Sequence, residues 1–189
     1  MIAVETRNLT LSTLSFGVCF AVWSIFSIIG IEIKQDLGLN ETEFGLLIAT
    51  PILTGSLTRI FLGIWADQYG GRSVFFAVMV LTAIATWMLS MASTYPMFLL
   101  SALGVGLAGG SFAVGITFVS CWYGKDRQGM MLGIFGMGNA GAAVTSFCAP
   151  FLLVAYGWDN VAKIYSVALL VMAVIFWIFT QDDPKTLAC

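Results

Sequence analysis

The stretch Leu47–Arg72, LIATPILTGSLTRIFLGIWADQYGGR, places an arginine inside an apolar run that is long enough to cross a membrane. Arg59 lies eight residues before Asp67, where the run becomes polar. Along a helix this separation is about 12 Å, which an arginine side chain does not comfortably span. A charge at bilayer depth costs roughly 2.5–3.5 kcal/mol on insertion scales, and such residues usually mark a functional site. The sequence therefore predicts a functional role for Arg59.

Arg59 has two interpretations. Its guanidinium can extend part of the way to the membrane surface or bind a carbonyl at a helix end. Alternatively, it faces a water-filled cavity and binds an anion. Gly55, Arg59 and Gly63 fall at i, i+4 and i+8 on one helix face, where glycines leave room for a neighbouring helix or a ligand. This spacing favours the anion-binding interpretation.

The composition is that of an integral membrane protein. Of 189 residues, 59% are hydrophobic and 10% are charged, whereas soluble domains carry about 25% charged residues. The net charge of −2 and the lack of histidine exclude nucleic-acid binding through a basic face and any histidine metal site. The four cysteines, Cys19, Cys121, Cys148 and Cys189, are far apart in the sequence. We therefore expect no metal and no cofactor.

The apolar residues divide into six runs. A bilayer core of about 30 Å needs about 20 apolar residues per helix, and short polar, turn-forming segments separate the runs. The expected spans are residues 10–31, 43–66, 73–93, 96–120, 128–154 and 161–180. Together they predict a single six-span transmembrane domain over residues 1–189, without a removable signal peptide, a linker or a second soluble domain.

The lysines and arginines predict the orientation of the chain. If the N-terminus is inside, the basic residues of the inner segments are Arg7, Arg72, Lys125, Arg127 and Lys185. Those of the outer loops are Lys34 and Lys163. Because cytoplasmic loops carry an excess of basic residues, five against two predicts that both termini lie in the cytoplasm.

The fifth span holds one amide, Asn139, within a dense run of glycines. These glycines are Gly129, Gly133, Gly136, Gly138 and Gly141. Such a sequence is tolerated where backbone and amide face something polar or tightly packed. Asn139 therefore either forms an interhelical hydrogen bond within a close helix contact or faces a polar ligand. Arg59 and Asn139 occupy the middle spans of two triplets, as expected for a three-plus-three inverted repeat with its site near the midplane.

Two further segments resemble a known family. The loop GIWADQYGGRS, residues 63–73, resembles the G-x-x-x-D-x-x-G-x-R signature of the major facilitator superfamily. The run GIFGMGNAG, residues 133–141, resembles the glycine-rich nitrate signature of the superfamily's nitrate/nitrite porters. With T-R-I-x-x-G around Arg59, residues 58–63, the chain is similar to the N-terminal six-helix half of such a porter.

The resemblance implies a set of site residues. An arginine of the second span contacts the anion in that family, and it corresponds here to Arg59. The residues that the resemblance assigns to substrate binding are Arg59, Asn139, Phe20, Phe112, Gly136 and Gly138. Those assigned to the conformational motif are Gly63, Asp67, Gly71 and Arg72. Phe135 stands at a signature position that is often small in the family, and it could narrow the cavity. The second substrate arginine of the family has no counterpart in this sequence.

The expected function is alternating-access uptake or exchange of a small planar anion, nitrate or nitrite, across the inner (plasma) membrane. The second half of the site would come from a C-terminal six-helix half or from a second copy of the chain. Two alternatives remain open: a truncated six-span protein or subunit that does not transport, and a porter of another small anion. An enzyme is not expected, because the sequence offers no nucleophile–base pair or metal cluster.

Overall fold

The computed structural model describes the backbone of residues 2–182 and the side chains of residues 4–182. Its helices are α1 (Ile2–Trp23), α2 (Phe26–Leu37), α3 (Glu41–Tyr69), α4 (Gly71–Leu89), α5 (Tyr95–Trp122), α6 (Lys125–Gly136), the 3-10 turn η1 (Met137–Asn139) and α7 (Ala140–Phe179). Lys185 and Cys189 lie outside the described residues. The expected all-helical fold is confirmed.

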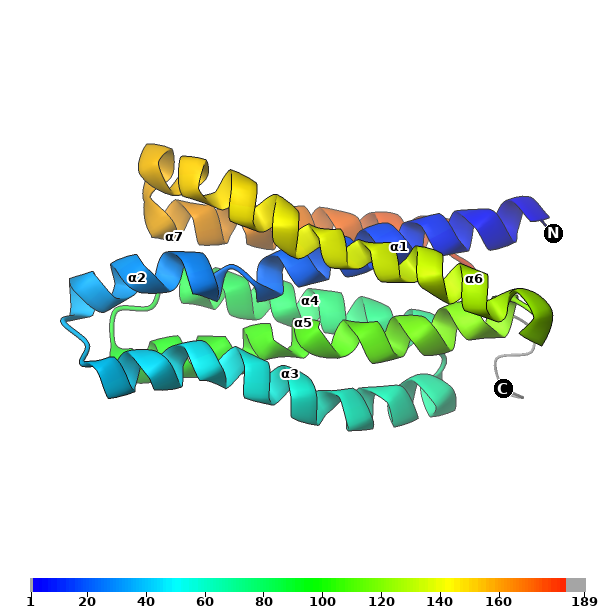
Figure 1. Cartoon of the computed structure of the whole chain (residues 1–189), viewed down its shortest axis with the longest axis horizontal. Helices are drawn as coiled ribbons and strands as arrows, with labels where there is room; N and C mark the ends of the chain where they lie inside the picture. Colours follow the sequence, from blue (N-terminus) through cyan, green and yellow to red (C-terminus); the bar gives the residue numbers. More distant parts are fainter. Residues whose placement is uncertain (1, 183–189) are drawn as a thin grey trace.

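Five continuous helical stretches of the described chain are long and apolar enough to cross a membrane. The last of them, Lys125–Phe179, is interrupted at Gly157, where φ is 77°. Glycine adopts this positive φ without a Cβ penalty, so the chain reverses there. α7 therefore has two segments, one before and one after Gly157. We call each membrane-length pass of the described chain a leg. The legs are α1 with α2, α3, α4, α5, α6 with the first part of α7, and the second part of α7 (Figure 1).

The connections gather at the two ends of the helical bundle. The N-terminus, the α3–α4 connection and the α5–α6 connection lie at one end (Figure 1). The α2–α3 and α4–α5 connections and the turn of α7 lie at the other. α5 packs against both α3 and α4, while α1 packs against α7 and α5. Helices α1 and α5 thus form the centre of the bundle.

The first leg is broken within the membrane, between the end of α1 at Trp23 and the start of α2 at Phe26. Backbone carbonyls freed at a break must be satisfied by protein groups, because lipid cannot donate a hydrogen bond. The carbonyl of Ala21 is freed here, because the Ile25 N–H bonds the Val22 carbonyl. It accepts from the Ser24 hydroxyl at 3.1 Å and from the Thr145 hydroxyl of α7 at 3.0 Å. A side chain of the break itself and one from α7 therefore stabilise it.

α3, which carries Arg59, has well-defined ends. At its start, the Asn40 side chain accepts from the backbone N–H of Glu43, and the Glu43 carboxylate accepts from the backbone N–H of Asn40. This capping box satisfies two N–H groups that the first turn leaves unpaired. At its end, Gly70 has a φ of 88°, and α4 begins at the next residue.

α3 and α5 approach each other through glycines. A Cβ added at Gly55 would lie 3.0 Å from the carbonyl oxygen of Gly106 and 3.3 Å from the Cα of Gly109. Small residues allow two helix backbones to come this close. The glycine face expected beside Arg59 therefore serves contact with a neighbouring helix, and it brings Arg59 against α5.

Candidate functional site

Arg59 lies on α3, half-buried against α5. Its Nε donates a hydrogen bond to the backbone carbonyl of Gly109 at 3.0 Å. Its guanidinium carbon lies 5.9 Å from the centre of the Phe112 ring. Among residues 4–182, no carboxylate forms an ion pair with Arg59, and no hydrogen bond involves its two terminal nitrogens. The positive charge therefore has a carbonyl and a ring beside it but no counter-ion from the described chain.

This arrangement leaves the forked end of the guanidinium available to a ligand. A planar guanidinium can bind a planar oxyanion through two parallel N–H···O bonds, which an ammonium group cannot reproduce. The bond to Gly109 fixes the Nε edge of the group and thereby the direction of the fork. The electrostatics are those of a site for a small anion.

Phe20 and Phe112 belong to one aromatic cluster, because both rings contact a third ring, that of Phe16. Phe16, which is fully buried, lies 5.3 Å from Phe20 and 5.4 Å from Phe112 between ring centres. Sequence reasoning did not single out Phe16. The available signal was its spacing, because Phe16 precedes Phe20 by four residues and so lies on the same face of α1.

Phe135 completes this aromatic cluster from α6. Its ring stacks on Phe16 at 4.9 Å and on Phe112 at 6.0 Å, and it is fully buried. It fills the space that Gly115 of α5 leaves by lacking a side chain, since a Cβ there would overlap the ring. Phe135 thus packs within the bundle instead of projecting into open space.

Asn139 lies in η1, the 3-10 turn that leads into α7, whereas Arg59 lies on α3. Its side chain is exposed at the end of η1, and its Nδ2 donates to the carbonyl of Gly136 at 2.8 Å. In the part of the chain that the structure describes, no hydrogen bond joins Asn139 to Arg59 or to another helix. α1 and α5 lie between α3 and the first segment of α7 (Figure 1). The single described bond of Asn139 is therefore local.

The glycines around Asn139 have different surroundings. A Cβ at Gly138 would overlap the ring of Phe16, and one at Gly141 would overlap the carbonyl of Gly17. A Cβ at Gly136 would meet nothing within 4 Å. Gly138 and Gly141 therefore allow α7 and η1 to pack on α1, whereas packing gives no reason for a glycine at position 136.

Residues of the motif between α3 and α4 also contribute to helix packing. A Cβ at Gly71 would lie 2.7 Å from the Cβ of Phe118, so α4 starts directly against α5. A Cβ at Gly63 would make ordinary contact with Ala113 at 3.9 Å, and Asp67 is exposed. The resemblance assigned Gly71 to the motif, but the second glycine of the signature falls on Gly70, and Gly70 is the residue with a positive φ.

Arg72 connects this motif to the end of α7. Its guanidinium lies 4.3 Å from the Trp177 ring centre and donates to the Trp177 backbone carbonyl. It also forms an ion pair with Asp182 at 3.3 Å. A cation beside the carbonyls of a helix C-terminus is favourable because the helix dipole is negative there.

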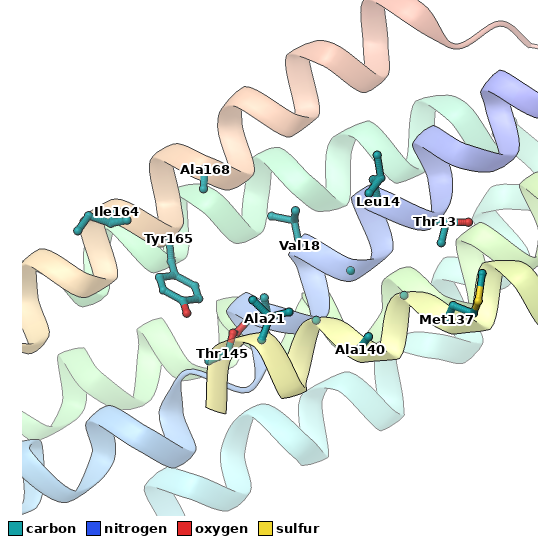
Figure 2. Close-up of a pocket in the computed structure, with 14 residues that line it drawn as sticks. Thr13, Leu14, Val18, Ala21, Met137, Ala140, Thr145, Ile164, Tyr165 and Ala168 are labelled. Carbon is teal, nitrogen blue, oxygen red and sulfur yellow. The ribbon is translucent and has the colours of Figure 1, made fainter. Parts of the chain in front are cut away.

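A cavity of about 410 Å³ lies between α1 and the two segments of α7. Figure 2 shows Tyr165 and Thr145 on its wall among mostly apolar side chains. Its lining contains Gly138 but neither Arg59 nor Asn139, and it contains no charged residue. An anion would lose its hydration there without gaining a partner, so this cavity is distinct from the Arg59 site.

Comparisons with known proteins agree with this fold. The Major Facilitator Superfamily profile matches residues 11–188. A probable nitrate/nitrite antiporter, NarK1, of Thermus thermophilus is 42% identical over 95% of this chain and 43% of its own length. A probable nitrate transporter, NarT, of Staphylococcus epidermidis is 35% identical over 94% of this chain and 46% of its own. The chain thus spans less than half the length of these relatives.

A solved structure supports the same architecture. The inward-facing, unoccupied structure of a bacterial homologue of the human lysosomal transporter Spinster superposes with a TM-score of 0.83 at 19% identity. The match covers 96% of this chain and 44% of that one. The likeness in fold, the matched profile and the membrane-length helices lead to one conclusion: this multi-pass membrane protein belongs to the major facilitator superfamily.

Proposed function

We propose that the chain is the N-terminal half of a nitrate/nitrite transporter, and that Arg59 binds the anion. The observation that carries this proposal is the unpaired guanidinium of Arg59, positioned by the Gly109 carbonyl beside the Phe112 ring. The names of the relatives, a probable nitrate/nitrite antiporter and a probable nitrate transporter, support the choice of anion.

The chemistry of the site suits a weakly hydrated planar anion. The Arg59 fork supplies charge-assisted hydrogen bonds in a plane, and the aromatic rings of Phe20 and Phe112 supply apolar walls. Asn139 would add a neutral donor, and Gly136 would let the anion approach the backbone, since no neighbouring atom needs its missing Cβ. Gly138 would act indirectly, because its missing side chain leaves room for the ring of Phe16.

The proposed site is completed by a second set of helices. The relatives are about twice as long as this chain, so a C-terminal six-helix half, or a second copy of the chain, would enclose Arg59 and Asn139 from the other side. The single six-span domain of residues 1–189 would rock against that partner to expose the site alternately. Gly63, Asp67, Gly71 and Arg72 would act in this movement. The chain would reside in the plasma membrane with both termini in the cytoplasm.

A binding titration tests the proposal. The 189-residue chain is purified in nanodiscs, and nitrate is titrated by calorimetry into wild type and Arg59→Ala, with chloride as the control anion. We expect saturable nitrate binding to wild type and none to Arg59→Ala. Arg127→Ala is the matched control, because Arg127 is an exposed arginine at the start of α6, and it should bind like wild type.

One result would contradict the proposal. Equal nitrate binding by wild type and Arg59→Ala would show that Arg59 does not bind the anion. A wild-type chain that is folded but binds no nitrate would show that the site forms only with the second set of helices.

A further inference from the structure

Trp23 occupies an unusual position at the break of the first leg. It is the last residue of α1, directly before the two residues that separate α1 from α2. Its indole Nε1 donates to the backbone carbonyl of Pro51 on α3 at 3.1 Å. Its ring lies 4.9 Å from that of Phe20. The side chain therefore connects the broken leg to α3 and to the aromatic cluster.

The same edge of the indole covers the point where α3 and α5 cross. A Cβ at Gly55 would lie 3.3 Å from Nε1 of Trp23, and a Cβ at Gly109 would lie 3.2 Å from it. The two glycines are themselves in contact, since a Cβ at Gly109 would lie 3.1 Å from the Cα of Gly55. Trp23 thus lies across both backbones where they meet.

This crossing leads directly to Arg59. The Gly109 carbonyl accepts the hydrogen bond from Arg59 Nε, so any shift of α5 relative to α3 would move the acceptor away from the guanidinium. Arg59 stands one helical turn beyond Gly55 on α3. The position of the anion-binding fork therefore depends on the separation of the two helices that Trp23 covers.

The other side of the indole borders empty space. A cavity of about 180 Å³ is lined by Trp23, Ser24, Phe26, Ser27, Ile48, Pro51 and Ile52. Packing therefore does not enclose the indole on every side, and the hydrogen bond to the Pro51 carbonyl contributes to fixing its position.

We propose that Trp23 is a positioning residue for the anion site. Its bond to Pro51 and its contact with Gly55 and Gly109 fix the spacing of α3 and α5, and this spacing places Arg59 Nε against the Gly109 carbonyl. Trp23 does not itself touch the anion. This inference rests on the proposed function, because it concerns the same site.

The test measures nitrate affinity and the number of sites per chain separately, by calorimetry on the 189-residue chain in nanodiscs. Trp23→Phe keeps an aromatic ring but removes the N–H donor. Because one hydrogen bond contributes about 0.5–1.5 kcal/mol net, we expect Trp23→Phe to weaken nitrate affinity by between about twofold and tenfold, with an unchanged number of sites. Trp23→Leu, which also removes the ring, should weaken it further.

Trp87→Phe is the matched control. Trp87 lies on α4, and 43% of its surface is exposed, so the same change there should leave nitrate affinity at the wild-type value. If Trp23→Phe does not fold, Trp23→Tyr, which keeps a ring of similar shape, is measured in the same way and should also bind more weakly than wild type.

The outcomes separate this inference from the proposed function. Wild-type affinity in Trp23→Phe would overturn the positioning role while the proposed function stands. Fewer sites at unchanged affinity would also overturn it, because a purely structural role lowers the folded fraction and not the affinity of folded chains. An equal loss of affinity in Trp87→Phe would overturn it too. A folded wild-type chain without nitrate binding would overturn the inference that Trp23 positions a working site in this half, while the proposed function, in which a second set of helices completes the site, stands.

Discussion

At the scale of single residues, Arg59 shows how a charge is accommodated among membrane-spanning helices. Its Nε donates a hydrogen bond to the Gly109 carbonyl, and its delocalised charge lies beside the Phe112 ring. An aromatic ring attracts a cation through the negative face of its π system. Neither contact neutralises the charge, so the residue keeps its capacity for an anion.

Replacing Arg59 by lysine tests whether nitrate binding needs only the positive charge or also the planar shape of the guanidinium. Arg59→Lys keeps the positive charge but loses the planar fork, and its single nitrogen cannot bond both Gly109 and two oxygens of an anion in one plane. We expect nitrate affinity to fall by about tenfold or more, which corresponds to about 1.4 kcal/mol. Calorimetric titration measures this, with Arg127→Lys as the matched control. Wild-type affinity in Arg59→Lys would mean that charge alone suffices.

At the scale of elements, the contact between α1 and the start of α7 depends on glycines. A Cβ at Gly141 would overlap the backbone carbonyl of Gly17, which cannot turn aside as a flexible side chain could. The two helices therefore need glycine at this position to keep their present separation.

Gly141→Ala and Gly136→Ala should accordingly have opposite effects on the stability of the fold. Gly141→Ala must push α7 away from α1 and should lower the unfolding temperature in detergent. Gly136→Ala meets nothing within 4 Å and replaces a poor helix former by the best one, so it should raise stability by up to about 1 kcal/mol. Thermal unfolding of the two variants beside wild type measures both effects. Equal destabilisation by the two substitutions would contradict the close contact at Gly141.

The same two variants distinguish a role in helix packing from a role in nitrate binding. If Gly136 lets the anion approach the backbone, Gly136→Ala should weaken nitrate binding while it stabilises the fold. Calorimetry on the thermally characterised protein gives this second reading. Unchanged nitrate affinity would limit Gly136 to a position without a role in binding.

At the scale of the whole molecule, the two ends of the described chain are joined. The fully buried Asn8 of α1 donates through Nδ2 to the Gln181 carbonyl at 3.0 Å and accepts from the Gln181 N–H at 3.4 Å. Arg72 holds the adjacent Asp182. Gln181 and Asp182 are therefore held by α1 and α4 together.

Asn8→Ala should loosen this end of the bundle. It removes both hydrogen bonds between Asn8 and the backbone of Gln181, and one such bond contributes about 0.5–1.5 kcal/mol net. We expect a lower unfolding temperature than that of wild type. Asn160→Ala is the matched control, because the described hydrogen bonds of exposed Asn160 are local: it donates to the Tyr156 carbonyl and accepts from Lys163 Nζ. This variant should unfold like wild type. Equal unfolding temperatures for Asn8→Ala and wild type would contradict a stabilising role for this contact.

The orientation of the whole molecule can be measured with introduced cysteines. Asn40 lies in the α2–α3 connection and Asp126 at the start of α6, at opposite ends of the bundle. In intact cells, a membrane-impermeant maleimide should label Asn40→Cys but should label Asp126→Cys only after permeabilisation. The four native cysteines give the background, which wild type measures. The reverse pattern would place both termini outside.

The sequence alone determined the class of fold and the family. Insertion of a helix depends on the hydrophobicity of about 20 consecutive residues, so each apolar run could be read independently of the others. The motif around Gly63 and Arg72 and the glycine run around Asn139 are also continuous in sequence, and they pointed to the superfamily that the profile then showed.

Only the tertiary structure decided which residues meet. Contacts between helices depend on how each helix is rotated and how closely its backbone approaches the next, and no single run of sequence contains that information. The contacts of Phe16 with three other rings and the position of Trp23 across Gly55 and Gly109 both arise in this way. A charge in an apolar run identified Arg59 as important, but its carbonyl and ring partners became known only once α3 was packed on α5.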